Sequence, residues 1–133
     1  MGRRVGRMRY LLDTTFAIDY LRGTDAATAR FARFFEDGDE PYLNDVVLCE
    51  LAVGERSTSE PAFLAFVRAA SYAQPGPEVA LQAGVWRRTA RKRGRTLNLA
   101  DALIAATADA LGAPVVTRNE RDFSLTPVRV EPY

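Results

Sequence analysis

Acidic residues are the side chains whose type and placement in this sequence suggest chemistry. Four of them stand in or soon after strongly apolar segments: Asp13, Glu50, Asp101 and Asp122. Carboxylates gathered at one site repel each other, and a bound divalent cation removes that repulsion. Oxygen-rich sites without imidazole or thiolate ligands suit Mg²⁺ or Mn²⁺. These residues therefore predict a metal site able to activate water.

The absence of histidine limits the available chemistry. The sequence of 133 residues contains no histidine and a single cysteine, Cys49, which we expect to be a small core residue. Catalysis by Ser-His-Asp or Cys-His groups, histidine metal ligands, an intramolecular disulfide and a cysteine-rich zinc site are therefore excluded. Any catalysis has to use carboxylates, hydroxyls, basic groups or a bound hard cation. The net charge of +1 gives the chain as a whole little attraction for nucleic acid.

The segments that must position these acids alternate between short apolar runs and longer amphipathic stretches. Strands are expected over residues 9–13, 41–43 and 114–117, with an edge strand over 128–130. A first helix is expected to begin at a cap, Thr14 or Thr15, and to end near Arg22. Further helices are expected over residues 24–36, from Asn44 or Asp45 to about Gly54, and over 59–70, 77–92 and 98–111. This alternation predicts an α/β domain with a mostly parallel sheet.

Length and composition fit one domain, residues 1–133. Hydrophobic residues make up 47% of the chain and charged residues 26%, which is typical of a globular domain with a sizeable core. Residues 1–8 predict a basic, flexible tail, and the natural start is either Met1 or Met8. No apolar run approaches the ~18 residues of a membrane span, so a cytoplasmic location without membrane contact is expected.

The predicted sheet gathers the acids at one edge. In open parallel α/β sheets, ligands bind beyond the carboxyl ends of the strands. Asp13 ends the first strand, Asp101 falls in the first turn of an apolar helix, and Asp122 follows a later strand. Each acid also has a purely structural interpretation: Asp13 as a helix cap, Glu50 as a solvent-facing residue, Asp101 as part of a capping box begun by Asn98, and Asp122 as a turn residue. The prediction depends on the joint pattern.

Three segments resemble a known family. They are LLDTTFAIDYLRG, VVLCELAVGE and LNLADALIAATADALGAPVVTRNERDF. In this order and spacing they resemble the PIN-domain nucleases, particularly the VapC-type toxins of bacterial toxin–antitoxin pairs. The resemblance covers residues 10–130, and ADALIAATA followed by VVTRNERDF is its most specific part. It implies a three-layer α/β/α fold with a central, mostly parallel sheet of four or five strands.

The resemblance also implies which residues form the site. Asp13 matches the acid of the first strand, Glu50 the helical glutamate, and Asp101 the acid of the DALIA segment. At the fourth acidic position, Asn119 stands where some relatives have aspartate and Asp122 supplies a carboxylate, so either of them is the fourth metal contact. Asp13, Asp101 and Asp122 would hold one or two ions, and Glu50 would orient water. The hydroxyls with supporting roles are those of Thr15 and Thr117.

The activity implied by the resemblance is Mg²⁺-dependent endonucleolytic cleavage of RNA by a toxin of a type II toxin–antitoxin system. The implied partners are the RNA, a VapB-type antitoxin and a second copy of the chain. Basic residues dense in the segment 87–95 are candidates for phosphate contacts, namely Arg87, Arg91 and Arg95, although a solvated helix face explains them equally well. Five phenylalanines favour either a core or an exposed groove and dimer face: Phe31, Phe34, Phe35, Phe63 and Phe66.

Two other classes of protein compete with this interpretation. A receiver-type signalling domain also gathers aspartates around Mg²⁺ at strand ends. It would need an acidic pair after the first strand and a lysine after the last one, whereas the only lysine here is Lys92, in a predicted helix. The second alternative is a catalytically inactive PIN fold used as a binding scaffold, and the presence of all four acids disfavours it.

Overall fold

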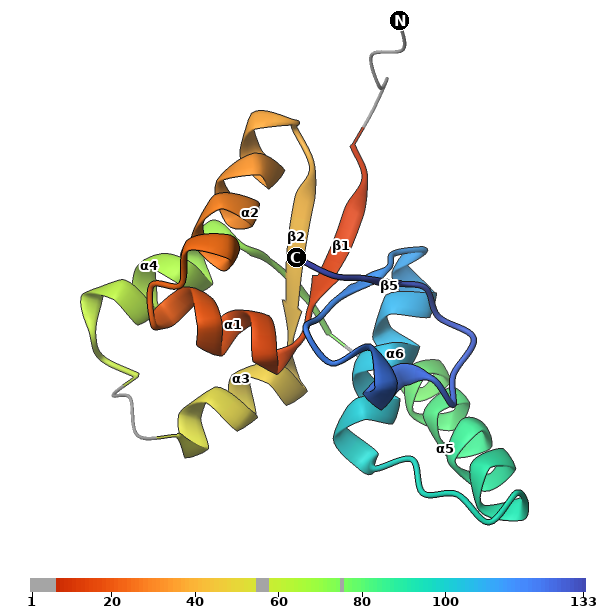
Figure 1. Cartoon of the computed structure of the whole chain (residues 1–133). Helices are drawn as coiled ribbons and strands as arrows, with labels where there is room; N and C mark the ends of the chain where they lie inside the picture. The colour runs from red at the N-terminus through yellow and green to blue at the C-terminus, as the bar shows by residue number, and fades with distance from the viewer. Residues whose placement is uncertain (1–6, 55–57, 75) are drawn as a thin grey trace, which may run out of the picture.

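The computed structural model describes residues 7–54, 58–74 and 76–133. Five strands and six α-helices alternate along these residues (Figure 1). In chain order the elements are β1 (Arg9–Leu12), α1 (Thr14–Leu21), α2 (Asp25–Glu36), β2 (Glu40–Asn44), α3 (Asp45–Val53), α4 (Pro61–Ala69), β3 (Ser71–Ala73), α5 (Pro77–Lys92), α6 (Leu99–Leu111), β4 (Val115–Val116), a 3₁₀ turn η1 (Glu120–Phe123) and β5 (Val130–Glu131).

The five strands form one sheet in the order β3-β2-β1-β4-β5, and every neighbouring pair is parallel. The predicted parallel α/β sheet of four or five strands is therefore confirmed. Strand β3 was not expected, because its three residues are half-buried or exposed and form no apolar run. The last strand is Val130–Glu131 rather than 128–130, and it lies at the predicted edge.

The order of the strands places a topological switch beside β1. The chain leaves β1 toward β2 on one side, and β4 returns to the other side of β1. In such sheets the crevice beyond the carboxyl ends of the two diverging strands is the binding site. Receiver domains have the order 2-1-3-4-5 instead. The receiver alternative is therefore wrong.

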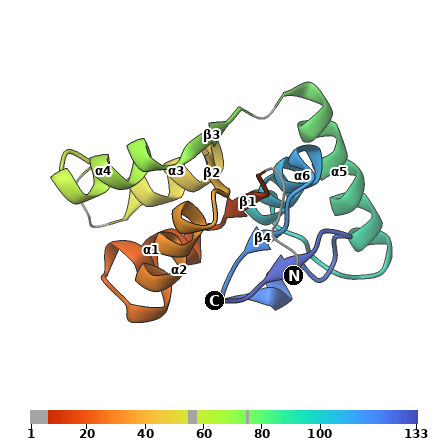
Figure 2. The ribbon, with the colours of Figure 1, turned by 90° about the horizontal axis from the view of Figure 1, so that it is seen from above.

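Helices cover both faces of the sheet, which confirms the three-layer arrangement. Figures 1 and 2 show α1, α2 and α4 on one side of β1 and β2, with α5 and α6 on the other. Strands β1 and β4 are the centre of the core, since Leu11, Leu12, Val115 and Val116 are completely buried. Continuous apolar runs of this kind are typical of strands covered on both faces.

The phenylalanines expected in a core or an exposed groove belong almost entirely to the core. Phe31 and Phe34 of α2 and Phe63 and Phe66 of α4 are buried together with Phe16. Phe35 is the exception, because 47% of its surface is exposed. The aromatic cluster thus fastens α1, α2 and α4 to one face of the sheet.

Two further sequence expectations concern the N-terminal tail and membrane-spanning segments. Of the tail expected over residues 1–8, only Arg7 and Met8 are described; the Met8 backbone N donates to Asp39 Oδ1 and its carbonyl accepts from the Glu40 N. The remaining residues lie outside the described part. Among the described residues, no helix is long and apolar enough to cross a membrane.

Candidate active site

Asp13 directly follows β1 and is the most firmly held acid of the site. Its side chain is buried, and both carboxylate oxygens accept hydrogen bonds: Oδ1 from the Thr15 hydroxyl at 2.8 Å and the Phe16 N at 3.0 Å, and Oδ2 from the Thr117 hydroxyl at 2.5 Å. The bond from Phe16 makes Asp13 the cap of α1. The expectation that Thr14 or Thr15 caps this helix is wrong, because the helix already begins at Thr14 and its preceding residue supplies the oxygen.

Glu50 reaches the site from α3. This helix is capped by Asn44, one of the two candidates that the sequence offered, and Glu50 lies on its exposed side. The Thr14 hydroxyl donates to Glu50 Oε1, so the first residue of α1 orients this carboxylate. The preceding residue, Cys49, is exposed rather than a core residue, because it shares the solvent-facing side of a short helix.

Asp101 lies in the first turn of α6 and pairs with the cap residue Asn98, as its structural interpretation predicts. Asn98 caps the helix by accepting from the Asp101 N at 2.8 Å, while the Asn98 side-chain amide donates to Asp101 Oδ2 at 2.8 Å. This reciprocal pair fixes the carboxylate at the helix start, where the backbone N–H groups also favour negative charge. The cap therefore orients the acid as well as starting the helix.

A buried hydrogen bond joins the helices that carry Glu50 and Asp101. Asn44 is fully buried at the end of β2; its Oδ1 caps α3 by accepting from the Val47 N, and its Nδ2 donates to the Thr107 hydroxyl of α6 at 3.0 Å. Thr107 in turn donates to the Leu103 carbonyl. Both side chains are satisfied, so this contact sets α3 against α6 without leaving an unpaired buried polar group.

The fourth position is more open than the others. Thr117 follows β4, is fully buried, and accepts from the Asn119 N at 2.9 Å while donating to Asp13. Asp122 lies in the 3₁₀ turn and is exposed, as is the Asn119 side chain, and the Asp122 N donates to the Asn119 carbonyl at 3.0 Å. Asn119 and Asp122 are therefore tied through the backbone, with both side chains directed to solvent.

The four acids lie near enough for the charges of Asp122, Glu50 and Asp13 to act on Asp101. Burial is the main reason why the pKa of Asp13 is raised, and the charge of Asp122 adds to it against three opposing hydrogen bonds. Burial also raises the pKa of Asp101 to about 6, with further contributions from Asp122, Glu50 and Asp13 and an opposing one from the Asn98 amide. The acids that were predicted to gather at one edge of the sheet thus repel one another.

The donor set fits a hard divalent cation. The converging groups offer only carboxylate, amide and hydroxyl oxygens, and their mutual repulsion is what a bound cation would relieve. As the side chains stand, no three acidic groups among the described residues are arranged to hold one metal ion.

A further charged group beside the site was missed at the level of sequence. Asp19 of α1 is buried, and its carboxylate accepts from Arg118 Nη1 at 2.9 Å and from the Tyr133 hydroxyl at 2.5 Å. Arg118 directly follows Thr117, and its backbone N contacts the Thr15 hydroxyl at 3.4 Å. The one signal available in the sequence was an aspartate within an otherwise apolar helix, FAIDYL.

The three arginines considered for RNA contacts are all exposed. Arg87 donates from Nε to the Leu97 carbonyl at 3.0 Å, which ties α5 to the segment leading into α6. Arg91 lies in the last turn of α5, and Arg95 lines a shallow cavity together with Arg121. The aromatic ring beside them, Trp86, is partly buried against α6 residues. One of the three thus has an evident structural role.

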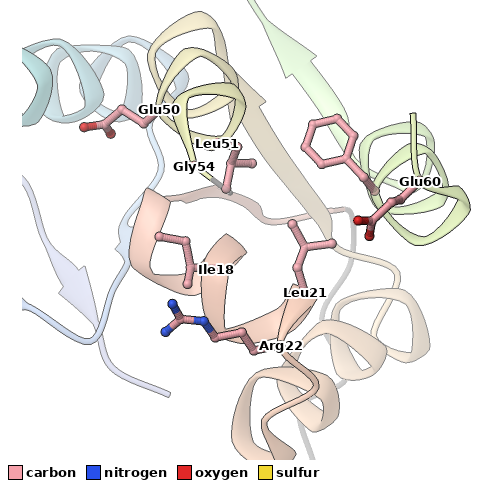
Figure 3. A pocket seen from close by; sticks show the side chains of 8 residues that line it. Ile18, Leu21, Arg22, Glu50, Leu51, Gly54 and Glu60 are labelled. Atoms are coloured by element: carbon pink, nitrogen blue, oxygen red, sulfur yellow. The ribbon is translucent and has the colours of Figure 1, made fainter. Parts of the chain in front are cut away.

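A pocket of about 540 Å³, lined by both apolar and charged residues, opens next to Glu50. It lies between α1, α3 and α4, and Figure 3 shows Ile18 and Leu21 of α1 among its lining side chains. Glu50 and Glu60 flank these apolar groups, and Arg22 lies at the α1 side of the opening (Figure 3). The pocket therefore combines an apolar floor with an acidic rim that it shares with the acid site.

Comparisons with known proteins agree with the fold. The PIN domain family model matches residues 10–128. The chain is also 35% identical over 123 residues to Ribonuclease VapC19 of Mycobacterium tuberculosis, a match that covers 92% of this chain and 98% of that protein. This chain is a VapC-type PIN-domain protein.

Solved structures share the same VapC-type fold. VapBC2 from Rickettsia felis bound to a promoter DNA fragment matches with a TM-score of 0.82 and 20% identity, covering 95% of this chain and 99% of the other. A toxin–antitoxin complex from Klebsiella pneumoniae matches with a TM-score of 0.75 and 24% identity, covering 93% and 98%. Because only 20% and 24% of the residues are identical, these two matches show a shared fold and carry no information about function.

Proposed function

We propose that this chain is the toxin of a type II toxin–antitoxin pair and an endoribonuclease that requires Mg²⁺. The ribonuclease class follows from its membership of the VapC-type family. The observation that supports these catalytic residues is that the charges of Asp122, Glu50 and Asp13 all raise the pKa of Asp101. The four residues come from separate parts of the chain. Mn²⁺ is expected to substitute, since it accepts the same oxygen ligands. RNA in the cytoplasm is the substrate.

In the proposed mechanism Asp13, Asp101 and Asp122 hold the cation. The chemistry that Mg²⁺ would supply there is a lower pKa for bound water and neutralisation of charge developing on the phosphate. Glu50 has one oxygen fixed by the Thr14 hydroxyl. Its other oxygen would accept a hydrogen bond from the attacking water and so orient it. Thr15 and Thr117 fix Asp13 by donating to its two oxygens, and these hydrogen bonds oppose the rise of its pKa that burial causes. No protein nucleophile takes part.

Asp101→Asn tests this proposal and its alternative, an inactive scaffold. The variant keeps the capping contact with Asn98 but removes a charge from the site, so Mg²⁺-dependent cleavage of RNA should disappear while the circular dichroism spectrum is unchanged. Asp109→Asn is the matched control, because Asp109 is an exposed residue of the same helix. Cleavage by a folded Asp101→Asn protein, or no cleavage by wild type with either metal, would overturn the proposed function.

We further propose that the pocket beside Glu50 receives a segment of a VapB-type antitoxin. Its apolar floor at Ile18 and Leu21 suits an apolar side chain, and the acidic rim at Glu50 suits a basic residue of the antitoxin. Such a segment would cover the acid site and block RNA. Co-expression with the neighbouring small gene should relieve growth arrest by wild type, and the substitution Leu21→Arg should prevent that rescue while leaving the toxicity.

A homodimer is the proposed solution state. The support is an exposed apolar pair one helical turn apart on α5, Leu81 with 72% and Val85 with 44% of its surface exposed. Light scattering after gel filtration should give the mass of two chains for wild type and of one chain for Leu81→Glu. A monomeric wild type would refute this part alone.

RNA contacts by Arg91 and Arg95 are proposed from their exposure at the end of α5 and beside the cavity at Arg121. Arg87 is included, although its Nε is bound to Leu97. Each lost phosphate contact with single-stranded RNA should lower the slope of log affinity against log salt by about 0.7. Glutamine substitutions at these positions, measured across a salt series, test each contact separately.

A further inference from the structure

Arg118 is held in an unusual way at the edge of the acid site. Its Nη1 donates to both oxygens of Asp19 at 2.9 Å, and Asp19 has only 7% of its side chain exposed. The Arg118 side chain itself is 56% exposed. A guanidinium has five N–H donors in a planar fork. Among the described residues only Nη1 has a partner, so the other nitrogens of a fixed cation face solvent.

The backbone of Arg118 is linked through Thr15 to Asp13, one of the carboxylates of the site. Its backbone N contacts the Thr15 hydroxyl, which in turn donates to Asp13. Its side chain lines a shallow cavity of about 540 Å³ together with Asn119 and Asp122. A cation and an acid of the site therefore share one cavity wall.

Tyr133 fixes the far side of the same carboxylate. Its hydroxyl donates to Asp19 Oδ2 at 2.5 Å, and its ring packs edge-on against Phe16 with centroids 4.8 Å apart. Glu131, two residues earlier, pairs with Arg30 of α2 at 2.8 Å. The end of the chain is thus anchored so that Asp19 has one fixed orientation and presents Arg118 in one direction.

We propose that Arg118 binds a phosphate of the RNA strand next to the scissile bond, and that Asp19 and Tyr133 are positioning residues that hold it there. The proposal rests on the ribonuclease function proposed above. A site with four acids repels an RNA backbone, and a planar guanidinium fork matches the geometry of phosphate oxygens. Asp19 fixes that fork before RNA arrives, which lowers the entropy lost on binding.

The first test separates binding from cleavage. Anisotropy of a labelled single-stranded RNA with Mg²⁺ is measured in the Asp101→Asn background, and cleavage in the wild-type background. Arg118→Gln should weaken RNA binding by about 10- to 100-fold, as expected for loss of a charge-assisted contact, and lower the salt slope by about 0.7. Arg118→Lys should recover only part of the affinity. Arg33→Gln, on the exposed side of α2, is the control for loss of one positive charge and should bind as wild type.

The second test addresses the positioning residues. Tyr133→Phe keeps the ring on Phe16 and removes only the hydrogen bond to Asp19, so RNA binding should weaken by about 3-fold. In the Arg118→Gln background the same change should have no further effect, because Tyr133 acts through Arg118. Additive losses would show an independent structural role and overturn this part.

The outcomes distinguish this inference from the proposed function. If wild type cleaves RNA but Arg118→Gln binds RNA with the affinity and salt slope of wild type, Arg118 is not a phosphate contact and the ribonuclease proposal stands. If binding depends on Arg118 while no RNA is cleaved, the ribonuclease proposal fails and the contact stands. If the Asp101→Asn protein does not bind RNA and wild type does not cleave it, both are overturned.

Discussion

Asp13 and Asp122 belong to one acid site but are held in opposite ways. Asp13 is buried at the centre of the sheet, and both of its oxygens accept hydrogen bonds from Thr15, Phe16 and Thr117. Asp122 is exposed in a 3₁₀ turn that is fixed through backbone hydrogen bonds. The difference indicates one rigid member of the site, Asp13, and one adaptable member, Asp122.

The largest expected effect comes from changing the rigid member. Asp13→Asn should lower cleavage of RNA by at least about 1000-fold, because several kcal/mol of charge stabilisation depend on it. The fold should survive, since asparagine also caps helices. Single-turnover cleavage in Mg²⁺ measures the loss, and the thermal melting curve checks the fold. A loss no larger than that of Asp122→Asn would remove the distinction between the two positions.

Changing Asp122, the adaptable member, should cause a smaller loss of cleavage, and a second substitution should restore part of it. Asp122→Asn should lower cleavage by about 10- to 100-fold, and Asn119→Asp in that background should restore part of it, because both side chains lie in the same turn and face solvent. The same rates, measured over a Mg²⁺ series, report the change in metal affinity. Rescue to the full rate would identify Asn119 as the fourth position, and an unaffected Asp122→Asn would exclude Asp122 from it.

Removing a hydrogen-bond donor to Asp13 should have a smaller effect than removing the charge of Asp13. Thr117→Val keeps the shape of a fully buried residue and removes the donor to Asp13 Oδ2. Metal affinity should fall by about 10-fold, as is usual for groups that orient a ligand. Titration calorimetry with Mn²⁺ measures it, with Thr126→Val as a control at a threonine outside the site. Equal affinities would mean that Thr15 and Phe16 suffice to hold Asp13.

The smallest effect is the dependence of stability on pH. The pKa of Asp101 is raised from 3.8 to about 6, so without metal the folded state binds the proton more tightly than the unfolded state. Unfolding free energy should therefore fall as pH rises from about 4 to 6. Asp101→Asn should flatten part of this decline and add about 1 kcal/mol at pH 7, a value reduced because the carboxyl is partly exposed. Urea unfolding without metal, repeated in Mg²⁺, checks both; stability that rises over this interval would contradict the prediction.

Local sequence was sufficient for elements whose signals lie within a few residues. Asn44, one of two candidate caps, begins α3, Asn98 begins α6, and Gly112 ends α6 with a positive φ of 67° that suits glycine. The apolar runs around Leu11 and Val115 gave the two central strands. Strand β3 was missed, because a segment of three half-buried or exposed residues pairs with β2 without an apolar pattern of its own.

For the site, the sequence by itself determined the residue types: carboxylates without histidine, placed at strand ends and helix starts. Only the tertiary structure decided how they are held. Thr14 reaches Glu50 across 36 positions, Asn44 reaches Thr107 across 63, and Asp19 meets Arg118 and Tyr133 across 99 and 114. Periodicity and capping act within a few residues, whereas these contacts form only after parallel strands have brought distant segments to the same edge of the sheet.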